Sequence, residues 1–192
     1  MPTRAAIGLG SNLGDRARHI AEAIGSLSEL GDLVATSALY QTAPVGGPEQ
    51  GPYLNAVVVI DTNLSARQLL DACLQIEQAH GRERRERWGP RTLDLDVVLF
   101  GRKVIDEPGL TVPHPELANR RFVLEPLVEA WPEATLPDGT AASALLAGVA
   151  DQAVQRMQGP VPSRSFSLAA IAVTVVGALS IWWIFDWLIG LI

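Results

Sequence analysis

The chain has 192 residues, enough for one domain of ordinary size with a hydrophobic core. Its net charge of −6 argues against a general nucleic-acid-binding protein, because such proteins need a basic surface. The single cysteine, Cys73, excludes a disulfide framework or a multi-cysteine metal site. No G-x-x-x-x-G-K-[ST] motif is present, which excludes nucleotide chemistry of the P-loop type.

The first half of the chain begins with a predicted strand and helix. Residues 5–10 form a short apolar run that predicts a strand, and Asp15 is a typical N-cap for the helix that follows. Gly31 would end this helix. Residues 33–41 and 54–62 are rich in strand-forming side chains and predict two further strands, with a proline- and glycine-rich loop between them.

A second helix and a fourth strand complete this pattern. Ser65 and Gln68 predict a capping box, Gly81 would end the helix, and residues 93–100 alternate as a strand does. The resulting order, β-α-β-β-α-β, is typical of a ferredoxin-like α+β fold. In such a fold an antiparallel sheet packs its helices on one face, so we expect the other face to be open for a ligand.

The residues after the fourth strand predict additional C-terminal helices. Residues 108–119 contain prolines and predict an irregular segment. Residues 122–130 and 141–157 predict helices, and residues 137–139 read Pro-Asp-Gly, a turn. We therefore expect a catalytic domain over residues 1–158.

A hydrophobic tail follows this domain. Residues 159–165 predict a linker, and residues 168–185 contain no charged residue, so we expect a single transmembrane helix over residues 166–192. A buried core helix is the alternative. Arg164 favours a domain on the cytoplasmic side, and the N-terminus lacks the apolar region of a signal peptide. The expected location is a cytoplasmic domain anchored to the inner face of the cell membrane.

The strongest functional signal lies in residues 81–100. Their first half combines a Trp-Gly-Pro turn with arginines that cannot form a packed core, and it predicts a mobile basic loop. The arginines are Arg82, Arg84, Arg85, Arg87 and Arg91. In the second half two rows of side chains alternate, one of Leu93, Leu95, Val97 and Leu99, the other of Asp94, Asp96, Val98 and Phe100.

This alternation places Asp94 and Asp96 on the same face of a strand. Two like charges so close repel unless a cation lies between them, and Mg²⁺ prefers carboxylate oxygens completed by water and phosphate oxygens. Because guanidinium groups bind phosphates bidentately, the neighbouring arginines favour phosphoryl transfer. Two alternatives are a solvated strand face with unrelated acids and a polymerase-like palm, which the net charge disfavours.

With these residues the chain resembles the 6-hydroxymethyl-7,8-dihydropterin pyrophosphokinases of folate biosynthesis. The resemblance covers roughly residues 5–139 and is carried by IGLGSNLGDR, YQTAPVGGPEQGPYLNAVV, IEQAHGRERRERWGPRTLDLDVVLFG, LTVPHPELANRRFVLEPL and PDG. It implies a ferredoxin-like fold and dependence on Mg²⁺. It also implies transfer of the β,γ-pyrophosphoryl unit of ATP to the pterin hydroxymethyl group, with release of AMP.

The resemblance implies roles for individual residues. Asp94 and Asp96 would hold two Mg²⁺ ions, and Arg82 and Arg91 would be catalytic residues that close over the triphosphate. The ATP side would comprise Glu77, Arg84, Thr111, His114 and Arg120. The pterin would stack between Tyr53 and Phe122, and Thr42, Asn55 and the backbone near Val45 would bind its amide edge.

Two residues of this chain depart from the family pattern, and both are expected to affect the affinity for ATP. Some relatives carry arginine where this chain has Gly109, and a polar residue where it has Leu74. Arg121 is expected to be a surface residue, and His114 without the resemblance reads equally as a turn histidine. A second function stays open: a catalytically inactive, membrane-tethered module that binds a pterin or a nucleotide.

Overall fold

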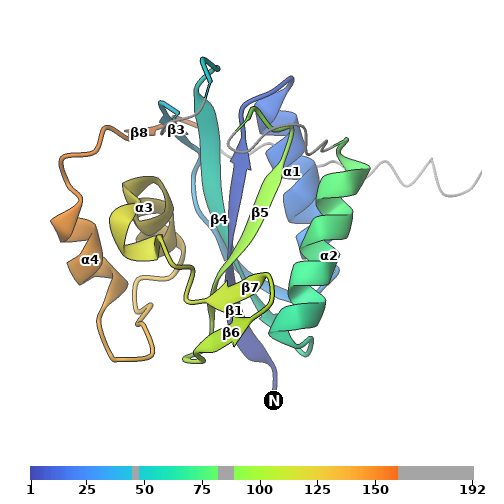
Figure 1. The fold of residues 1–192 in the computed structure, drawn as a ribbon, viewed down its shortest axis with the longest axis vertical. Coiled ribbons are helices and arrows are strands. Elements are labelled where there is room, and N and C mark those ends of the chain that lie inside the picture. Colours follow the sequence, from blue (N-terminus) through green and yellow to red (C-terminus); the bar gives the residue numbers. More distant parts are fainter. Residues whose placement is uncertain (45–47, 82–88, 160–192) are drawn as a thin grey trace, which may run out of the picture.

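The computed structural model describes residues 1–44, 48–81 and 89–159 (Figure 1). Its elements, in chain order, are β1 (Thr3–Ser11), α1 (Arg16–Leu27), β2 (Asp32–Thr36), β3 (Tyr40–Thr42), β4 (Tyr53–Thr62), α2 (Ala66–Ala79), β5 (Asp94–Phe100), β6 (Ile105–Glu107), β7 (Leu110–Val112), the 3₁₀ helix η1 (Leu117–Asn119), α3 (Arg121–Ala130), α4 (Ala142–Gly148) and β8 (Gln155–Arg156).

An antiparallel sheet forms the centre of the domain, which confirms the predicted mixed α+β class. Its strand order is β5-β1-β4-β3-β8, and β2 pairs with the other end of β4. The strand predicted over residues 33–41 is divided into β2 and β3. Ser37 lies at the division, where its hydroxyl accepts a hydrogen bond from the Val57 amide and replaces a backbone acceptor.

Both predicted helix starts are confirmed. The Asp15 carboxylate accepts a hydrogen bond from the Arg18 amide at the beginning of α1. Ser65 and Gln68 form the capping box of α2, because each side chain binds the other residue's amide. Gly31, by contrast, does not end α1, which stops at Leu27.

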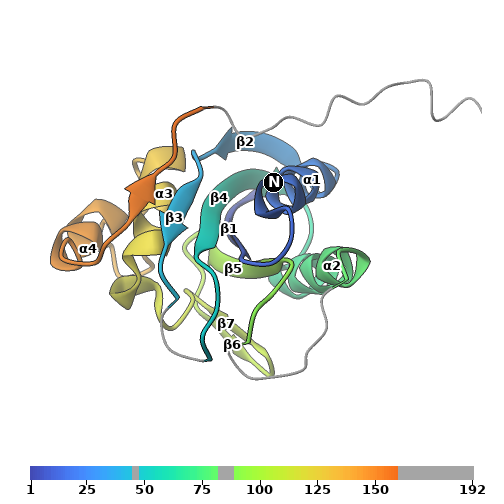
Figure 2. The same cartoon turned by 90° about the horizontal axis from the view of Figure 1, so that it is seen from above.

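Helices cover both faces of the sheet, so the expected open face is wrong. Figures 1 and 2 show α1 and α2 on one side and α3 and α4 on the other. The reason is visible in β4, which is apolar on both faces. Its side chains Ala56, Val58 and Ile60 pack with α1 and α2, whereas Val57 and Val59 pack with α3. A strand that is apolar on both faces must be covered twice.

A bulge in β5 changes the predicted faces of two residues. Ile7 of β1 pairs with Val97 and Ala6 pairs with Leu99, so Val98 is an additional residue between them. As a result Phe100 packs in the cluster with α1 and α2, and Leu99 packs in the cluster with α3. The strict alternation predicted from the sequence would have placed these two side chains the other way round.

The C-terminal part of the domain also differs from prediction. The helix predicted over residues 141–157 stops at Gly148, and the chain then returns to the sheet as β8, which pairs with β3. Arg121 fixes the segment between α4 and β8, because its guanidinium donates to the carbonyls of Ala150 and Gln152 at 2.7 and 2.8 Å. Arg121 is therefore a partly buried anchor rather than a simple surface residue.

The segment predicted as irregular, residues 108–119, contains the β6–β7 hairpin's second strand and η1. Gly109 lies in the two-residue turn of this hairpin with a φ of +75°, a conformation that favours glycine. The conformation of this turn accounts for glycine at position 109.

Within the residues that the structure describes, no helix is both long enough and apolar enough to cross a membrane. The predicted transmembrane helix, residues 166–192, lies outside the described residues, as does the linker from residue 160 onward.

Candidate active site

The predicted pterin and metal residues meet around Gly10, near the end of β1. Gly10 pairs with Asn55 of β4 on one side and with Asp94 of β5 on the other. A methyl group built on Gly10 would lie 3.5 Å from Asn55 Oδ1 and 3.8 Å from both Tyr53 Cδ1 and Asp94 Cβ. The glycine thus leaves a small polar space between two residues of β4 and Asp94 of β5, which is far from them in the sequence.

The sheet face around this space is apolar along one part of the strands and polar along the other. Val57 and Val59 of β4 and Val98 of β5 lie under α3 and α4. Closer to the site, the same strands carry Asn55 and Asp94 in place of apolar side chains. The polar space therefore lies beside the second helical layer, on the face that the sequence predicted to be open along its whole length.

Asp94 and Asp96 flank Leu95, whose side chain is buried in the core. Burial, and then the charge of Asp94, raise the pKa of Asp96 above its ordinary range. Arg91 donates a charged hydrogen bond to Asp94. Two carboxylates two residues apart on one strand are a donor set that fits a hard divalent cation such as Mg²⁺.

His114 and Arg120 lie near Asp96, and both oppose the rise in its pKa. Burial, and then the positive charge of Arg120, lower the pKa of His114, while the Asp96 carboxylate opposes this shift. The Glu116 amide donates to His114 Nδ1 at 3.1 Å, so the neutral imidazole carries its proton on Nε2. His114 also belongs to a segment fixed to β5, because its amide donates to the Val98 carbonyl at 3.0 Å.

Glu77 lies beneath the acid pair rather than on the surface. Its side chain is 1% exposed, and Oε1 accepts a hydrogen bond of 2.7 Å from the Leu95 amide, between Asp94 and Asp96. Burial, and then the charge of Glu77, raise the pKa of the buried Cys73 thiol to about 12.

The predicted pterin residues Thr42 and Asn55 are in direct contact. Asn55 Nδ2 donates to Thr42 Oγ1 at 2.9 Å, and both side chains are buried. Phe122 is the second residue of α3, in the facing layer, and its ring centre lies 5.8 Å from the guanidinium carbon of Arg120. Stacking of a ligand between Tyr53 and Phe122 stays a prediction.

The remaining predicted residues divide into two groups. Thr111 is exposed on β7, where its hydroxyl lies 3.4 Å from Asp106 Oδ1. Val45, Arg82 and Arg84 lie outside the described residues.

Asn12 was not among the predicted site residues, yet it connects two segments of the candidate site. Its side chain accepts from the Arg91 amide at 2.7 Å and donates to Gln50 Oε1 at 2.8 Å. It therefore joins the loop before β4 to the segment before β5. The neighbouring Ser11 hydroxyl donates to the Thr92 carbonyl at 2.6 Å. The hydrogen-bond partners of Asn12 lie 38 and 79 residues away in the sequence, so they leave no local pattern that could have predicted this role.

Comparison with known proteins identifies relatives over most of the chain. Residues 6–132 match the family described as 7,8-dihydro-6-hydroxymethylpterin-pyrophosphokinase (HPPK). A 2-amino-4-hydroxy-6-hydroxymethyldihydropteridine pyrophosphokinase of Pseudomonas aeruginosa is 43% identical over 161 residues, covering 83% of this chain and 99% of that protein. The protein of the same name from Bacillus subtilis is 46% identical over 125 residues, covering 64% of this chain and 75% of that protein.

A solved structure agrees at the level of the fold. The HPPK-DHPS protein of Plasmodium falciparum superimposes with a TM-score of 0.61 at 16% identity, over 77% of this chain and 44% of that one. This chain thus spans less than half the length of that protein. Because the family match extends over more than half of the chain, and relatives above 40% identity match along most of their own length, this chain belongs to the HPPK family.

Proposed function

We propose that this chain transfers pyrophosphate from ATP to 6-hydroxymethyl-7,8-dihydropterin and releases AMP, a step of folate biosynthesis. Membership of the HPPK family is the first support. The single structural observation that carries the proposal is the convergence at Gly10, where the predicted pterin residues Tyr53 and Asn55 meet the acid strand at Asp94. A pterin held there would have its hydroxymethyl group close to a site for phosphate-bound metal.

Asp94 and Asp96 would hold the metal, and we assign two Mg²⁺ ions to this acid pair. When bound, Mg²⁺ supplies neutralisation of the phosphate charge and a lower pKa for the attacking hydroxyl. Glu77 acts as a positioning residue, because its hydrogen bond to the Leu95 amide fixes the backbone between the two acids. In this proposal Glu77 therefore acts on the ATP site through the acid strand and does not contact ATP itself.

The arginines stabilise the charge that develops on the transferred group. Arg91 is already held beside the acid pair by its contact with Asp94 and by the Asn12 side chain on its amide. Arg82 and Arg84 would complete the cationic lining, and for these two the proposal rests on the sequence. Fixed guanidinium groups need no rearrangement as the charge moves, which lowers the barrier to transfer.

His114, Arg120 and Thr111 bind ATP in this proposal. The neutral His114 presents a proton on Nε2, and Arg120 presents a positive charge near Asp96, so both suit an anionic ligand. On the pterin side, Asn55 and Thr42 already contact one another and form a pre-organised polar edge. Tyr53 and Phe122 supply the flat apolar walls, and the backbone near Val45 completes the edge.

The test is a product analysis with the full-length chain kept in detergent. We expect ATP, Mg²⁺ and 6-hydroxymethyl-7,8-dihydropterin to yield AMP in amounts that match the pyrophosphorylated pterin, and no AMP when the pterin is omitted. ADP as the product would contradict pyrophosphoryl transfer. Binding of both ligands by folded protein without any AMP would instead identify an inactive binding module.

We also propose that residues 166–192 attach the domain, residues 1–158, to the inner face of the cell membrane. The support is the sequence alone, in which residues 168–185 contain no charge. Expressed as a whole, the chain should sediment with membranes and resist extraction by carbonate. The variant that ends at residue 159 should remain in the supernatant and keep its activity, and loss of folding on this truncation would contradict the assignment.

A further inference from the structure

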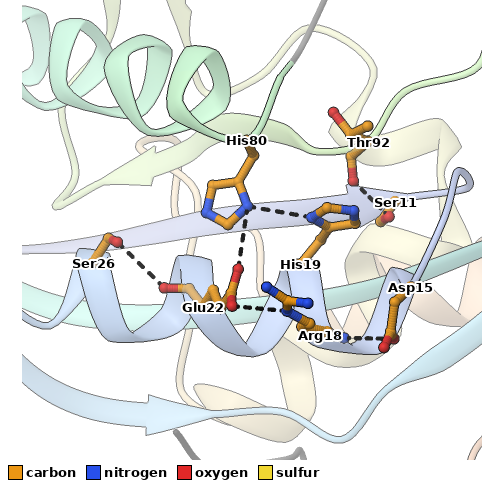
Figure 3. Close-up of polar contacts among 8 residues, drawn as sticks. All are labelled: Ser11, Asp15, Arg18, His19, Glu22, Ser26, His80 and Thr92. Atoms are coloured by element: carbon orange, nitrogen blue, oxygen red, sulfur yellow. Dashed lines mark hydrogen bonds and ion pairs between the residues drawn. The ribbon is translucent and has the colours of Figure 1, made fainter. Parts of the chain in front are cut away.

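A cluster of two histidines and a glutamate joins α1 to the end of α2, away from the acid pair in sequence. His19 and Glu22 lie three residues apart on α1 and so share one face of that helix, and His80 is the C-cap residue of α2. Figure 3 shows the His80 ring above α1, with contacts to both His19 and Glu22. The ligand atoms of all three side chains lie within 4.8 Å of one another.

The contacts of this cluster converge on one nitrogen. His80 Nδ1 lies 3.3 Å from His19 Nδ1 and 3.8 Å from Glu22 Oε2. Two ring nitrogens can share one proton, but they repel if both carry one at this distance. A single proton on His80 Nδ1 would therefore serve both the imidazole of His19 and the carboxylate of Glu22. A cation in place of this proton would satisfy all three groups together.

The spacing and the chemistry of the three groups fit a transition-metal ion. Ligands bound at about 2.0–2.1 Å around a tetrahedral Zn²⁺ lie about 3.3 Å from each other, which is the separation of the two imidazole nitrogens here. Two imidazoles with one carboxylate are a ligand set that zinc proteins use. We propose that His19, Glu22 and His80 form a Zn²⁺ site that leaves one coordination position for water.

The surroundings favour coordination over a loose surface contact. The side chains of His80 and Glu22 are only 11% and 24% exposed. The Arg18 guanidinium donates to Glu22 Oε1 at 2.9 Å, which orients the carboxylate and leaves Oε2 toward His80. Such a contact to the outer oxygen is the usual way in which a carboxylate ligand is held in position.

This site is separate from the proposed Mg²⁺ site, because the two share no residue and differ in ligand type. Mg²⁺ prefers oxygen ligands, whereas a site with two imidazoles selects zinc-like ions. Binding through His80 Nδ1 would place the proton of the neutral imidazole on Nε2 and would link α1 to the C-terminal end of α2. The inference does not depend on the proposed pyrophosphoryl transfer.

Zn²⁺ binding to the full-length chain in detergent tests the proposal, with excess Mg²⁺ present to occupy the acid pair. We expect one Zn²⁺ per chain, a midpoint of thermal unfolding that rises with Zn²⁺ concentration, and a large change in the ¹⁵N chemical shifts of two of the three histidines. His19→Gln, Glu22→Gln and His80→Gln should each weaken binding by about tenfold or more, which corresponds to about 1.4 kcal/mol.

Asp94→Asn is the matched control, and it should bind Zn²⁺ as the wild type does. If Asp94→Asn abolishes binding while His19→Gln retains it, the ion belongs to the acid pair and the proposal is overturned. Unchanged affinity in all three cluster variants would overturn it as well. Should His80→Gln fail to fold, the partly exposed His19→Gln variant and the histidine spectra of the wild type decide the question.

Discussion

Asn12 and Arg91 are joined by two hydrogen bonds that run in opposite directions. The Arg91 amide donates to Asn12 Oδ1 at 2.7 Å, and the Asn12 amide donates to the Arg91 carbonyl at 3.0 Å. Asn12 Nδ2 also donates to Gln50 Oε1 at 2.8 Å. Asn12, only 7% exposed, therefore joins the end of β1 to the segment before β4 and to Arg91, which contacts the proposed metal ligand Asp94.

Replacement of Asn12 by alanine should weaken both stability and catalysis. The substitution leaves the Arg91 amide without its side-chain acceptor, so we expect the free energy of unfolding to fall by about 1–3 kcal/mol. Poorer positioning of Arg91 should lower kcat/KM for ATP, by about tenfold for each 1.4 kcal/mol of lost transition-state stabilisation. Urea denaturation and steady-state kinetics measure the two effects.

Asn63→Ala is the control for this variant, because Asn63 is exposed in the turn after β4. Its free energy of unfolding should stay within about 0.5 kcal/mol of the wild type. If Asn12→Ala behaves like Asn63→Ala, the double link between Asn12 and Arg91 has no energetic importance.

Asp96→Asn should reduce kcat at least about 100-fold, because it removes one of the two charges that we propose to hold the metal. The dependence of rate on Mg²⁺ concentration should shift to higher values in any residual activity. Asp96→Asn tests the metal assignment more specifically than Asp94→Asn does, because Asp94→Asn also breaks the ion pair with Arg91. Asp71→Asn, at an exposed position of α2, should keep full activity. Near-normal turnover by Asp96→Asn would refute the metal assignment.

Substitutions of Glu77 distinguish the effect of its hydrogen bond to the Leu95 amide from the effect of its charge. Glu77→Leu leaves the buried Leu95 amide without an acceptor and should cost about 1–3 kcal/mol of unfolding free energy. Glu77→Gln keeps an acceptor oxygen and should retain most of the stability. We expect the apparent affinity for Mg²⁺ to fall more in Glu77→Leu than in Glu77→Gln, as judged from Mg²⁺ titrations of activity. Equal losses in both variants would show that the charge of Glu77 matters more than its hydrogen bond.

Glu129 should make stability dependent on pH in the acid range. Partial burial alone would raise its pKa, but hydrogen bonds from Arg156, the Tyr40 hydroxyl and the Ala38 amide outweigh that effect and hold the pKa below its usual range. The stabilisation is fully present above the unfolded-state pKa of about 4.3 and is lost as pH falls through the lower folded-state pKa. Glu129→Gln should therefore be less stable than the wild type at neutral pH.

The difference in unfolding free energy between wild type and Glu129→Gln should narrow as pH falls below about 4.3, as measured by urea denaturation at a series of pH values. Glu29→Gln, at an exposed position after α1, supplies a comparison of the same chemistry. A constant difference across the acid range would mean that the Glu129 carboxylate titrates alike in the folded and unfolded chains.

The local elements of this protein were predictable from the sequence because they depend on neighbouring residues. The Asp15 cap and the Ser65–Gln68 capping box each involve side chains and amides within three residues. The acid strand was predictable because its side chains alternate with a period of two until Val98. Resemblance to the HPPK family came from the same local runs, since RWGPRTLDLD combines a loop, a turn and a strand in ten consecutive residues.

Long-range packing decided the remainder. α3 and α4 cover the second face of the sheet because β4 is apolar on both faces and both must be buried. The bulge at Val98 depends on the pairing of β5 with β1. Asn12 and Arg91 are 79 residues apart, and His19 and His80 are 61 apart. Such contacts exist only after the sheet and helices have packed, because no pattern along the chain encodes which distant polar groups will meet. Sequence determined the family and indicated the acids of the candidate site, whereas tertiary structure brought Asn55 and Asp94 together around Gly10.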